Sequence, residues 1–447
     1  MASAIEQFAA NINLQAFGKA TELKRRLWFT LGALIVYRIG TFIPLPGIDA
    51  AVMRDIFQAN AGGILGMFNM FAGGALERMT IFALNIMPYI TASIIVQLLT
   101  TVSPHLEQLK KEGEAGRKKI NQYTRYGTVF LAGLQAYGIA VGLEGMTSSA
   151  GTAVHDPGLF FRFTTVVTLI GGTMFLLWLG EQITARGVGN GISLIIFAGI
   201  VAGLPNALAG TLELGRTGAL SAFAIMFILG MVVLVVGFVV FMERAQRRII
   251  VQYPKRQVGA KMFGGESSHL PLKLNTAGVI PPIFASSILL MPVTVASFSA
   301  DQGPAWLQTI TGYLAHGEPL YMVIYAATII FFCFFYTAIV FNPEDTAENL
   351  RKYGGFIPGI RPGKKTADYL DYVLTRLTVI GAAYLTAVCL LPEFLIARNA
   401  LPFYFGGTSL LICVTVTMDT VGQIHSHLIA HQYEGLIKKA KLKGRRG

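Results

Sequence analysis

Gly62 to Thr100 reads GGILGMFNMFAGGALERMTIFALNIMPYITASIIVQLLT and decides the fold, because it holds two apolar segments of different kinds. No charged residue occurs between Arg78 and Glu107. A helix needs roughly 20 apolar residues to cross a bilayer, and Met79 to Leu99 supplies that length. We therefore predict a membrane-spanning helix here.

The first apolar segment, Ile64 to Phe71, is too short to span and lies between Gly62-Gly63 and Gly73-Gly74. Non-spanning backbone at membrane depth is tolerated only where it is buried in protein or lines a cavity. The segment is therefore either a movable stopper in a pore or a loop helix packed on the bundle, and these residues alone favour the packed helix. Helical spacing places Asn69 and Gly66 on one side and five apolar side chains on the other: Ile64, Leu65, Met67, Phe68 and Phe71.

The composition is that of a polytopic membrane protein. The chain has 447 residues, of which 53% are hydrophobic and only 13% are charged, and the mean hydropathy is +0.56. A formal net charge of +12 could indicate nucleic-acid binding, but in a membrane protein excess lysine and arginine first report topology.

Apolar runs predict ten membrane spans. Because run boundaries are soft, the limits are approximate: Leu27 to Phe42, Thr80 to Leu99, Gly127 to Leu143, Phe163 to Leu179, Ile192 to Ala209, Leu220 to Met242, Ala277 to Phe298, Leu320 to Phe341, Leu377 to Leu395 and Pro402 to Val421. Most lysines and arginines fall in the two tails and in the loops after the even-numbered spans up to the eighth. This asymmetry predicts that both termini are cytoplasmic.

Ten spans divide into two sets of five near Asn206 to Gly218. An odd number of spans in each half implies that related halves are inverted, with the working site between them. The predicted organisation is an N-terminal half, 1–209, a C-terminal half, 210–430, and a basic cytoplasmic tail, 431–447.

The sequence resembles the SecY family of protein-conducting channels over nearly its whole length. The resemblance rests on MFNMF and GGAL in the opening stretch and on longer words in the same order: RIGTFIPLPGID, KKEGEAGRKKINQYTRYG, WLGEQITARGVGNGIS, ERAQRRI, FNPEDTAENLRKYG and FYFGGTSLLI. It implies an all-α polytopic membrane protein with ten transmembrane helices in two inverted five-helix halves around a central pore. It also implies a short re-entrant plug helix, at about residues 62–74.

The resemblance assigns a pore ring of aliphatic side chains that closes on a translocating chain. Isoleucines one turn apart on a membrane helix usually face lipid or pack, so the spacing alone carries little weight. Flexible apolar side chains do suit the role, because a narrow dewetted constriction blocks ions. The matching positions are Ile86, Ile90, Ile192, Ile196, Ile283 and Ile412.

Small polar residues on the second and seventh spans have two interpretations of equal weight. They could supply ordinary hydrogen bonds between helices, or they could form a lateral gate that parts to let a hydrophobic signal helix meet membrane lipid. The residues are Thr91, Ser93, Gln97, Asn275, Ser286 and Ser287.

Two cytoplasmic loops, about 243–275 and 342–370, are longer than topology requires. The first contains strand-like Arg248 to Val251 and His269 to Leu272, which predicts a hairpin protrusion. Both loops resemble the family's docking loops for the ribosome or the SecA motor ATPase, through Lys255, Arg256, Arg361, Lys364 and Lys365.

The resemblance implies a function and a set of partners. The chain would pass unfolded secretory polypeptides across a bacterial inner membrane, bind signal peptides and nascent chains, and release transmembrane segments laterally. SecE and SecG would complete a heterotrimer. No catalysis and no cofactor are implied. Which of the ribosome and the motor dominates, whether heterotrimers pair, and how the resting gate is set stay open.

The residues leave one main rival, an ion-coupled secondary transporter with inverted repeats. Such transporters generally use ionisable groups near the midplane, whereas Glu181, Glu393 and Asp419 lie near the ends of predicted spans. An intramembrane enzyme fits less well, because every histidine lies in a loop or tail. Cys333, Cys389 and Cys413 lie in separate apolar runs, so no disulfide framework or metal site is predicted.

Two residues remain unexplained by the sequence. Arg38 lies within the first predicted span, where a charge is costly unless it is paired or near a polar region. Asn85 immediately precedes Ile86, and a polar residue is unexpected beside an apolar ring.

Overall fold

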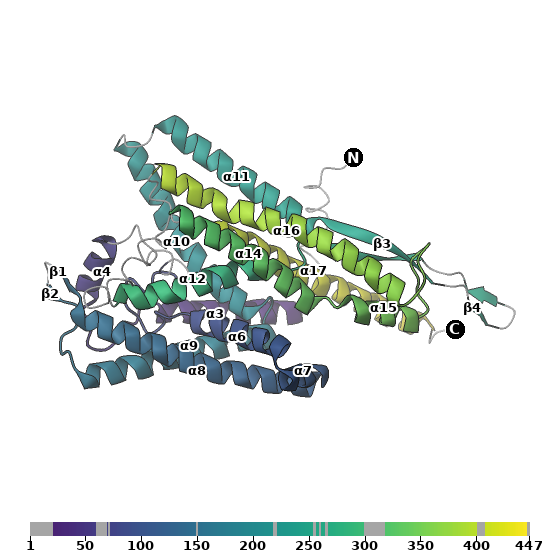
Figure 1. Ribbon diagram of the computed structural model, residues 1–447, viewed down its shortest axis with the longest axis horizontal. Helices are drawn as coiled ribbons and strands as arrows, with labels where there is room; N and C mark the ends of the chain where they lie inside the picture. The colour runs from purple at the N-terminus through teal and green to yellow at the C-terminus, as the bar shows by residue number, and fades with distance from the viewer. Residues whose placement is uncertain are drawn as a thin grey trace. The chain divides into compact units, whose positions relative to one another are not determined.

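The computed structural model describes residues 21–59, 69, 72–148, 151–217, 221–253, 256–258, 261–263, 267–298, 318–399 and 407–444. Helices dominate these ranges (Figure 1). The chain forms two compact units. Unit 1 comprises Met1–Asn206, Thr294–Gly303 and Val416–Gly447, and unit 2 comprises Ala207–Val293 and Pro304–Thr415.

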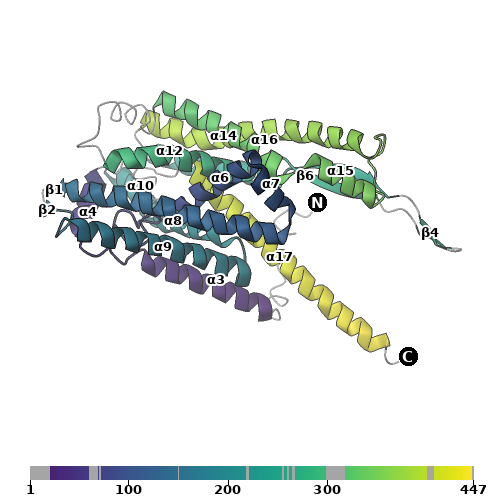
Figure 2. The same cartoon turned by 60° about the horizontal axis from the view of Figure 1, so that its bottom comes forward.

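Unit 1 is built on a group of membrane-length helices. Helices α8 and α9 run side by side, and α3 lies along α9 (Figure 2). Helix α10 (Gly191–Arg216) begins in this unit and crosses into unit 2. The remaining elements are α3 (Thr21–Gly40), α4 (Ala50–Ala59), α6 (Met87–Val102), α7 (Pro104–Lys111), α8 (Glu114–Gly145), β1 (Thr147–Ser148), β2 (Gly151–Thr152) and α9 (Leu159–Arg186).

Unit 2 combines long helices with a two-stranded ribbon formed by β3 and β6. Helices α14 and α16 pack on each other, and α15 packs on α16. Helix α17 (Gly407–Gly444) starts here and continues into unit 1. The other elements are α11 (Ala222–Arg244), β3 (Gln246–Gln252), β4 (Arg256–Val258), β5 (Lys261–Phe263), β6 (Ser267–Lys273), α12 (Ile280–Phe298), α14 (Pro319–Val340), α15 (Pro343–Lys352) and α16 (Lys364–Asn399).

Each of the ten predicted spans contains a helix. Within the described residues, seven helices are long and apolar enough to cross a membrane, or eight if α6 and α7, bent by 98°, form one span. Helix α3 is not among the seven, since it carries Lys24, Arg25, Arg26 and Arg38. Helix α12 contributes only a shorter apolar stretch, Ile280–Leu289. The polytopic, mostly helical architecture agrees with the sequence.

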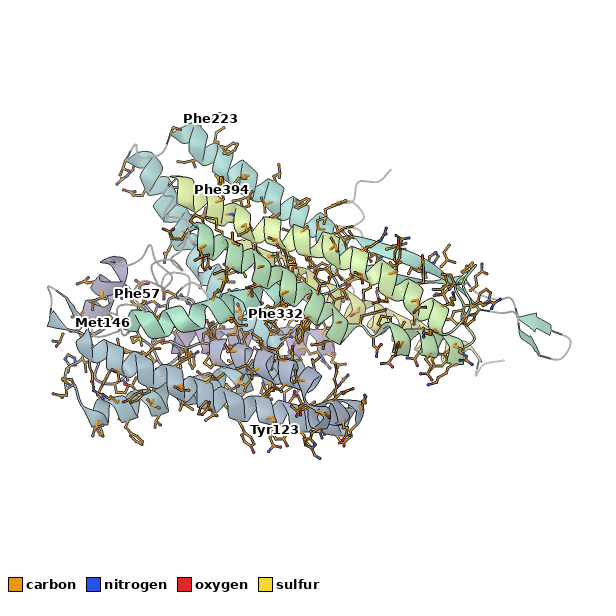
Figure 3. All side chains as sticks on the ribbon, in the orientation of Figure 1. Phe57, Tyr123, Met146, Phe223, Phe332 and Phe394 are labelled. Atoms are coloured by element: carbon orange, nitrogen blue, oxygen red, sulfur yellow. The ribbon has the colours of Figure 1, made fainter. Side chains whose placement is uncertain are left out.

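Large apolar side chains cover the outside of the helices. Phe223 on α11 and Phe394 on α16, labelled in Figure 3, are 78% and 57% exposed. Monomeric soluble proteins rarely expose extended apolar patches. Such a surface is expected of helices that face lipid, where apolar residues are the stable choice.

The second span differs from the prediction, because its helix starts at Met87 and not near Thr80. Thr80 forms an isolated bridge with Pro44, and the Ile81 amide donates to the Ile43 carbonyl (3.1 Å). Asn85 has a φ of +49°, a left-handed conformation that does not continue a right-handed helix. The chain from 80 to 86 therefore crosses the end of α3 before the helix begins.

The segment from residue 80 to residue 86 packs tightly against α9, at a position where α9 has a glycine. A Cβ atom at Gly172 would overlap the carbonyl oxygen of Ile81, whereas a Cβ at Gly171 would meet nothing within 4 Å. The Phe82 ring stacks between the rings of Tyr37 and Phe175, with centroids 6.2 and 5.9 Å away. Gly172 thus permits the close approach that positions the start of α6.

Gly172→Ala should destabilise the protein by about 1–3 kcal/mol, because the added methyl group forces backbone to move in a packed region. Gly171→Ala is the matched control, and it should be neutral or stabilising by up to ~1 kcal/mol, since alanine favours helix over glycine. Thermal unfolding of the two purified variants in detergent measures both. Equal melting temperatures would contradict this description of the packing.

Candidate functional site

Asn69, within the predicted plug, is joined to the turns that follow it by reciprocal hydrogen bonds. Its Oδ1 accepts from the Glu77 amide (2.9 Å), and its Nδ2 donates to Glu77 Oε2 (3.2 Å). The Gly74 amide donates to the Asn69 carbonyl (2.9 Å). Ile64, Leu65, Met67, Phe68 and Phe71 lie outside the described residues. The structure thus defines the last part of the predicted plug and the turns after it, residues 69 and 72–77, which we call the hinge.

Two side chains of α3 hold this hinge from the other side. Tyr37 donates from its hydroxyl to the Ala72 carbonyl (3.4 Å), and Arg38 donates from Nη1 to the Gly73 carbonyl (2.6 Å). The Arg38 guanidinium also lies 5.0 Å from the centroid of the Phe42 ring, a favourable cation–π position. These contacts supply the partner for Arg38 that the sequence left open.

Gly73 is required at this hinge for two reasons. Its φ is +64°, and a Cβ there would lie 3.0 Å from the Cα of Gly199 on α10. Gly74 has a similar φ of +82°, but its Cβ would meet only the Arg78 guanidinium, at 3.8 Å or more. The hinge therefore lies directly against α10.

Gly73→Ala should destabilise the hinge by about 1–2 kcal/mol more than Gly74→Ala, because both strain the left-handed backbone but only the first overpacks against Gly199. The difference between the two melting temperatures measures the contact with α10. If Gly74→Ala were the more damaging variant, the close approach of Gly73 to α10 would be wrong.

The pore-ring candidates of unit 1 occupy the starts of two helices. Ile86 caps the beginning of α6 and is 1% exposed, and Ile90 follows one turn later at 7%. On α10, Ile192 is half-buried and Ile196 is 5% exposed. Asn190 fixes the start of α10, since its Oδ1 accepts from the Ile192 amide (3.1 Å).

The two remaining candidates lie in unit 2. Ile283 is half-buried in the first turn of α12, and Ile412 on α17 is 1% exposed. The convergence of all six isoleucines on one ring stays a prediction.

Asn85 has a conformational reason to precede Ile86. It is 2% exposed, and its positive φ is one that asparagine tolerates better than most residues. From the sequence alone, Asn85 is an unexpected polar residue beside an apolar ring. The backbone turn that leads to Ile86 at the start of α6 explains why an asparagine occupies this position.

Five of the six gate candidates make hydrogen bonds within their own units. On α6, Thr91 donates to the Met87 carbonyl (3.1 Å), and Gln97 donates to Ser93 (3.4 Å). Ser286 donates to the Ile283 carbonyl (3.0 Å), and Ser287 is buried beside it at 4%. Asn275 Nδ2 donates to Glu243 Oε1 (2.7 Å). Both interpretations of these residues stay predictions.

The two predicted docking loops meet in unit 2. Strands β3 and β6 pair antiparallel from Gln246 with Lys273 to Gln252 with Ser267, and Gln252 exchanges two backbone hydrogen bonds with Phe356 (2.9 and 3.0 Å). Ile357 packs with the ribbon in one apolar cluster. The prediction of a hairpin protrusion is confirmed.

Most of the predicted docking cations lie in the described parts of these two loops. Arg361, Lys364 and Lys365 are exposed, at the turn before α16 and in its first residues. Arg256 begins β4, and Lys255 lies outside the described residues. The second loop therefore presents its cations on a turn anchored to the ribbon.

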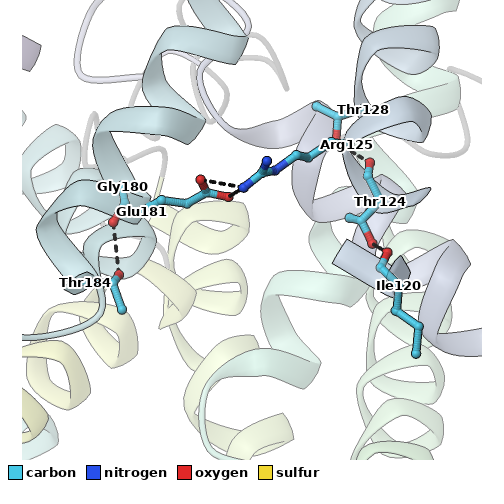
Figure 4. Close-up of polar contacts among 7 residues, drawn as sticks. All are labelled: Ile120, Thr124, Arg125, Thr128, Gly180, Glu181 and Thr184. Carbon is cyan, nitrogen blue, oxygen red and sulfur yellow. Dashed lines mark hydrogen bonds and ion pairs between the residues drawn. The ribbon is translucent and has the colours of Figure 1, made fainter. Parts of the chain in front are cut away.

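Sequence reasoning missed a polar cavity in unit 1. Arg125 on α8 donates from Nη2 to both carboxylate oxygens of Glu181 on α9 (2.6 and 2.7 Å; Figure 4). The pair borders a cavity of about 410 Å³ that Tyr89, Asn121 and Ile192 also line. The sequence does place Arg125 and Glu181, which have opposite charges, at the ends of neighbouring predicted spans. It does not show which span ends lie together, so it does not predict this ion pair.

The described residues offer no metal site: no group of three or more histidine, cysteine or acidic side chains is placed to hold an ion. Cys333 and Cys389 are buried and Cys413 is half-buried, and none of the three forms a disulfide within the described residues.

Comparison with known proteins identifies relatives across almost the full chain. The SecY family model matches residues 80–421. Protein translocase subunit SecY of Escherichia coli (strain K12) is 59% identical over 430 residues, which cover 96% of this chain and 97% of that protein. Protein translocase subunit SecY of Vibrio cholerae is 58% identical, covering 95% and 96%.

Two solved structures share the fold at low sequence identity. One, described as the structure of a protein conducting channel, is 20% identical with a TM-score of 0.68, covering 92% of this chain and 93% of that one. The other, Sec61 in the canine ribosome-channel complex from the endoplasmic reticulum, is 19% identical with a TM-score of 0.65 and the same coverages.

Proposed function

This chain belongs to the SecY family, and we propose that it is a protein-conducting channel. It passes unfolded secretory polypeptides across a bacterial inner membrane and releases transmembrane segments laterally into the bilayer. One observation carries the proposal: 59% identity to a protein translocase subunit over nearly the whole of both chains. The break before α6 supports it, because irregular backbone in a membrane protein is expected where it lines a cavity.

In this proposal Ile86, Ile90, Ile192, Ile196, Ile283 and Ile412 form the constriction. Apolar side chains fit around many sequences without forming hydrogen bonds to any, and a dewetted constriction resists ions. The segment at residues 62–74 is the plug, hinged at Asn69 and Gly73. Its anchoring to α3 through Tyr37 and Arg38 supports a defined resting position.

The proposed working unit is two halves, 1–209 and 210–430, followed by the tail 431–447. Thr91, Ser93 and Gln97 on α6 would face Asn275, Ser286 and Ser287 of the other half across a lateral gate. Hydrogen bonds across such a seam would hold it closed, and a hydrophobic signal helix could replace them with lipid-facing apolar contacts.

The chain is a multi-pass membrane protein, and we place both termini in the cytoplasm from its charge asymmetry. The ribbon and the Arg361 turn then lie on the cytoplasmic side, where a ribosome or a SecA motor would dock. Exposed cations suit contacts to ribosomal RNA phosphates. SecE and SecG are the proposed membrane partners in a heterotrimer.

We propose no catalytic role, since the relatives bear the name of a translocase subunit, and energy for transport would come from a partner. The rival interpretation as an ion-coupled transporter is not favoured by the same relatives. It would also need ionisable groups near the midplane, where the sequence places no aspartate or glutamate.

Reconstitution in vesicles tests the function. The full chain, with its SecE- and SecG-type partners, is given an unfolded precursor and the SecA-type motor, and protease protection measures import. We expect import that depends on a signal sequence and on the motor. Ion-gradient-driven uptake of a small solute without precursor import would contradict the proposal.

A further inference from the structure

The base of the β3–β6 ribbon contains a buried carboxylate that has no place in the proposed site. Glu243 lies in the last turn of α11 and is 9% exposed. Its Oε1 accepts the 2.7 Å hydrogen bond from Asn275 Nδ2. Acidic side chains are almost never buried unless they are paired, so this bond is part of how the junction is built.

Asn275 also fixes the turn that leads into α12. Its Oδ1 accepts from the Gly278 amide (3.0 Å), and its Nδ2 donates to the Gly278 carbonyl (3.1 Å). Gly278 has a φ of +64°, which glycine adopts readily. Helix α12 begins two residues later, at Ile280. One side chain therefore joins the end of α11 to the start of α12.

Two backbone contacts confine the same junction. The Leu274 amide donates to the Ala245 carbonyl (2.9 Å), directly beyond the last ribbon pair, Gln246 with Lys273. On another side, a Cβ at Gly381 of α16 would lie 3.0 Å from the Leu274 carbonyl oxygen. The junction is thus held between the ribbon and α16 and has little room to deform.

We propose that Glu243 is a positioning residue that couples the β3–β6 ribbon to α12, so that a load on the ribbon displaces the first turns of α12. The proposal rests on the proposed function, in which the ribbon docks a partner and α12 carries Ile283, Ser286 and Ser287. Strand β3 continues from the end of α11 (Figure 1), and β6 precedes α12 along the chain. At 2.7 Å the Asn275–Glu243 contact lies at the short end of the range for hydrogen bonds from nitrogen to oxygen, so a displacement at the end of α11 is passed on to Asn275.

The test uses the full chain with its partner subunits in membrane vesicles and non-translating ribosomes as the docking probe. A fluorescent amino acid sensitive to its surroundings replaces Ile288 on α12, which is 37% exposed. Three quantities are measured: ribosome affinity, the shift in emission at saturating ribosomes, and precursor import.

Glu243→Ala should leave ribosome affinity unchanged and lower the equilibrium constant for α12 displacement, obtained from the emission shift, by roughly tenfold, the size expected when a buried donor loses an acceptor. Precursor import should fall together with the emission shift. Glu243→Gln keeps an oxygen that accepts from Asn275 and should retain most of the shift. Asp371→Ala removes an exposed carboxylate on α16 and should behave like the unsubstituted chain.

Three results would overturn the coupling: a full shift in Glu243→Ala, a loss of affinity that accounts for the whole loss of import, or a defect in Glu243→Gln equal to that in Glu243→Ala. If Glu243→Ala does not accumulate, Glu243→Leu carries the same expectations, since it keeps most of the buried side-chain volume but accepts no hydrogen bond from Asn275. An unsubstituted chain that binds no ribosomes would contradict the docking function instead, so the two failures are distinguishable.

Discussion

Arg361→Glu should abolish most precursor import while the protein still inserts in the membrane. The side chain is exposed on a turn that is held against the ribbon through Ile357 and Phe356. Arginines at the centre of an interface are often worth about 2 kcal/mol or more, or roughly thirtyfold in affinity. Reversing the charge adds repulsion to that loss, so binding of the docking partner should fall at least this far.

Binding of ribosomes and of the SecA-type motor to vesicles, measured separately, identifies which partner Arg361 serves. Lys352→Glu is the control, because Lys352 is an exposed cation paired with Glu348 one turn away on α15, and such pairs contribute little. Normal import by Arg361→Glu would refute the docking role. A defect of equal size in Lys352→Glu would show that general surface charge is responsible.

Deleting Ile64 to Phe71 should make the resting channel leak ions while precursor import continues. The deletion removes the predicted stopper and also Asn69, and with it both hydrogen bonds to Glu77. The apolar constriction would remain, because its six isoleucines lie elsewhere in the chain. Single-channel conductance in planar bilayers, with no precursor present, measures the leak.

Asn69→Ala distinguishes the effect of losing the stopper from the effect of weakening its hinge. It keeps the apolar segment but removes the side chain that joins it to Glu77, so its leak should be intermediate. Unchanged conductance in the deletion would count against the stopper and in favour of a loop helix that only packs on the bundle.

The sequence predicts the helices well because a helix that crosses an apolar medium is apolar along most of its length. All ten predicted spans contain helices, and the strand-like runs at Arg248 and His269 do pair in one ribbon. Both patterns are local: a run of apolar residues or an alternation is visible without knowing what lies beside it.

Contacts between distant residues were the part that the sequence could not supply. The late start of α6 depends on Asn85 adopting a positive φ and on residues 80–81 bonding to 43–44. Arg38 finds its partner in the Gly73 carbonyl, a backbone atom that no residue pattern marks. The Arg125–Glu181 contact joins two separate helices, and the Glu243–Asn275 contact joins α11 to the turn before α12; spacing along the chain does not report such pairs.

The central claim is that a translocating polypeptide passes through one apolar ring formed by both halves. The most direct measurement is crosslinking to a stalled secretory chain, with a photoreactive residue substituted in turn at Ile86, Ile192, Ile283 and Ile412. We predict adducts from all four positions. Adducts from none, in membranes that export normally, would contradict the ring and reopen the transporter interpretation.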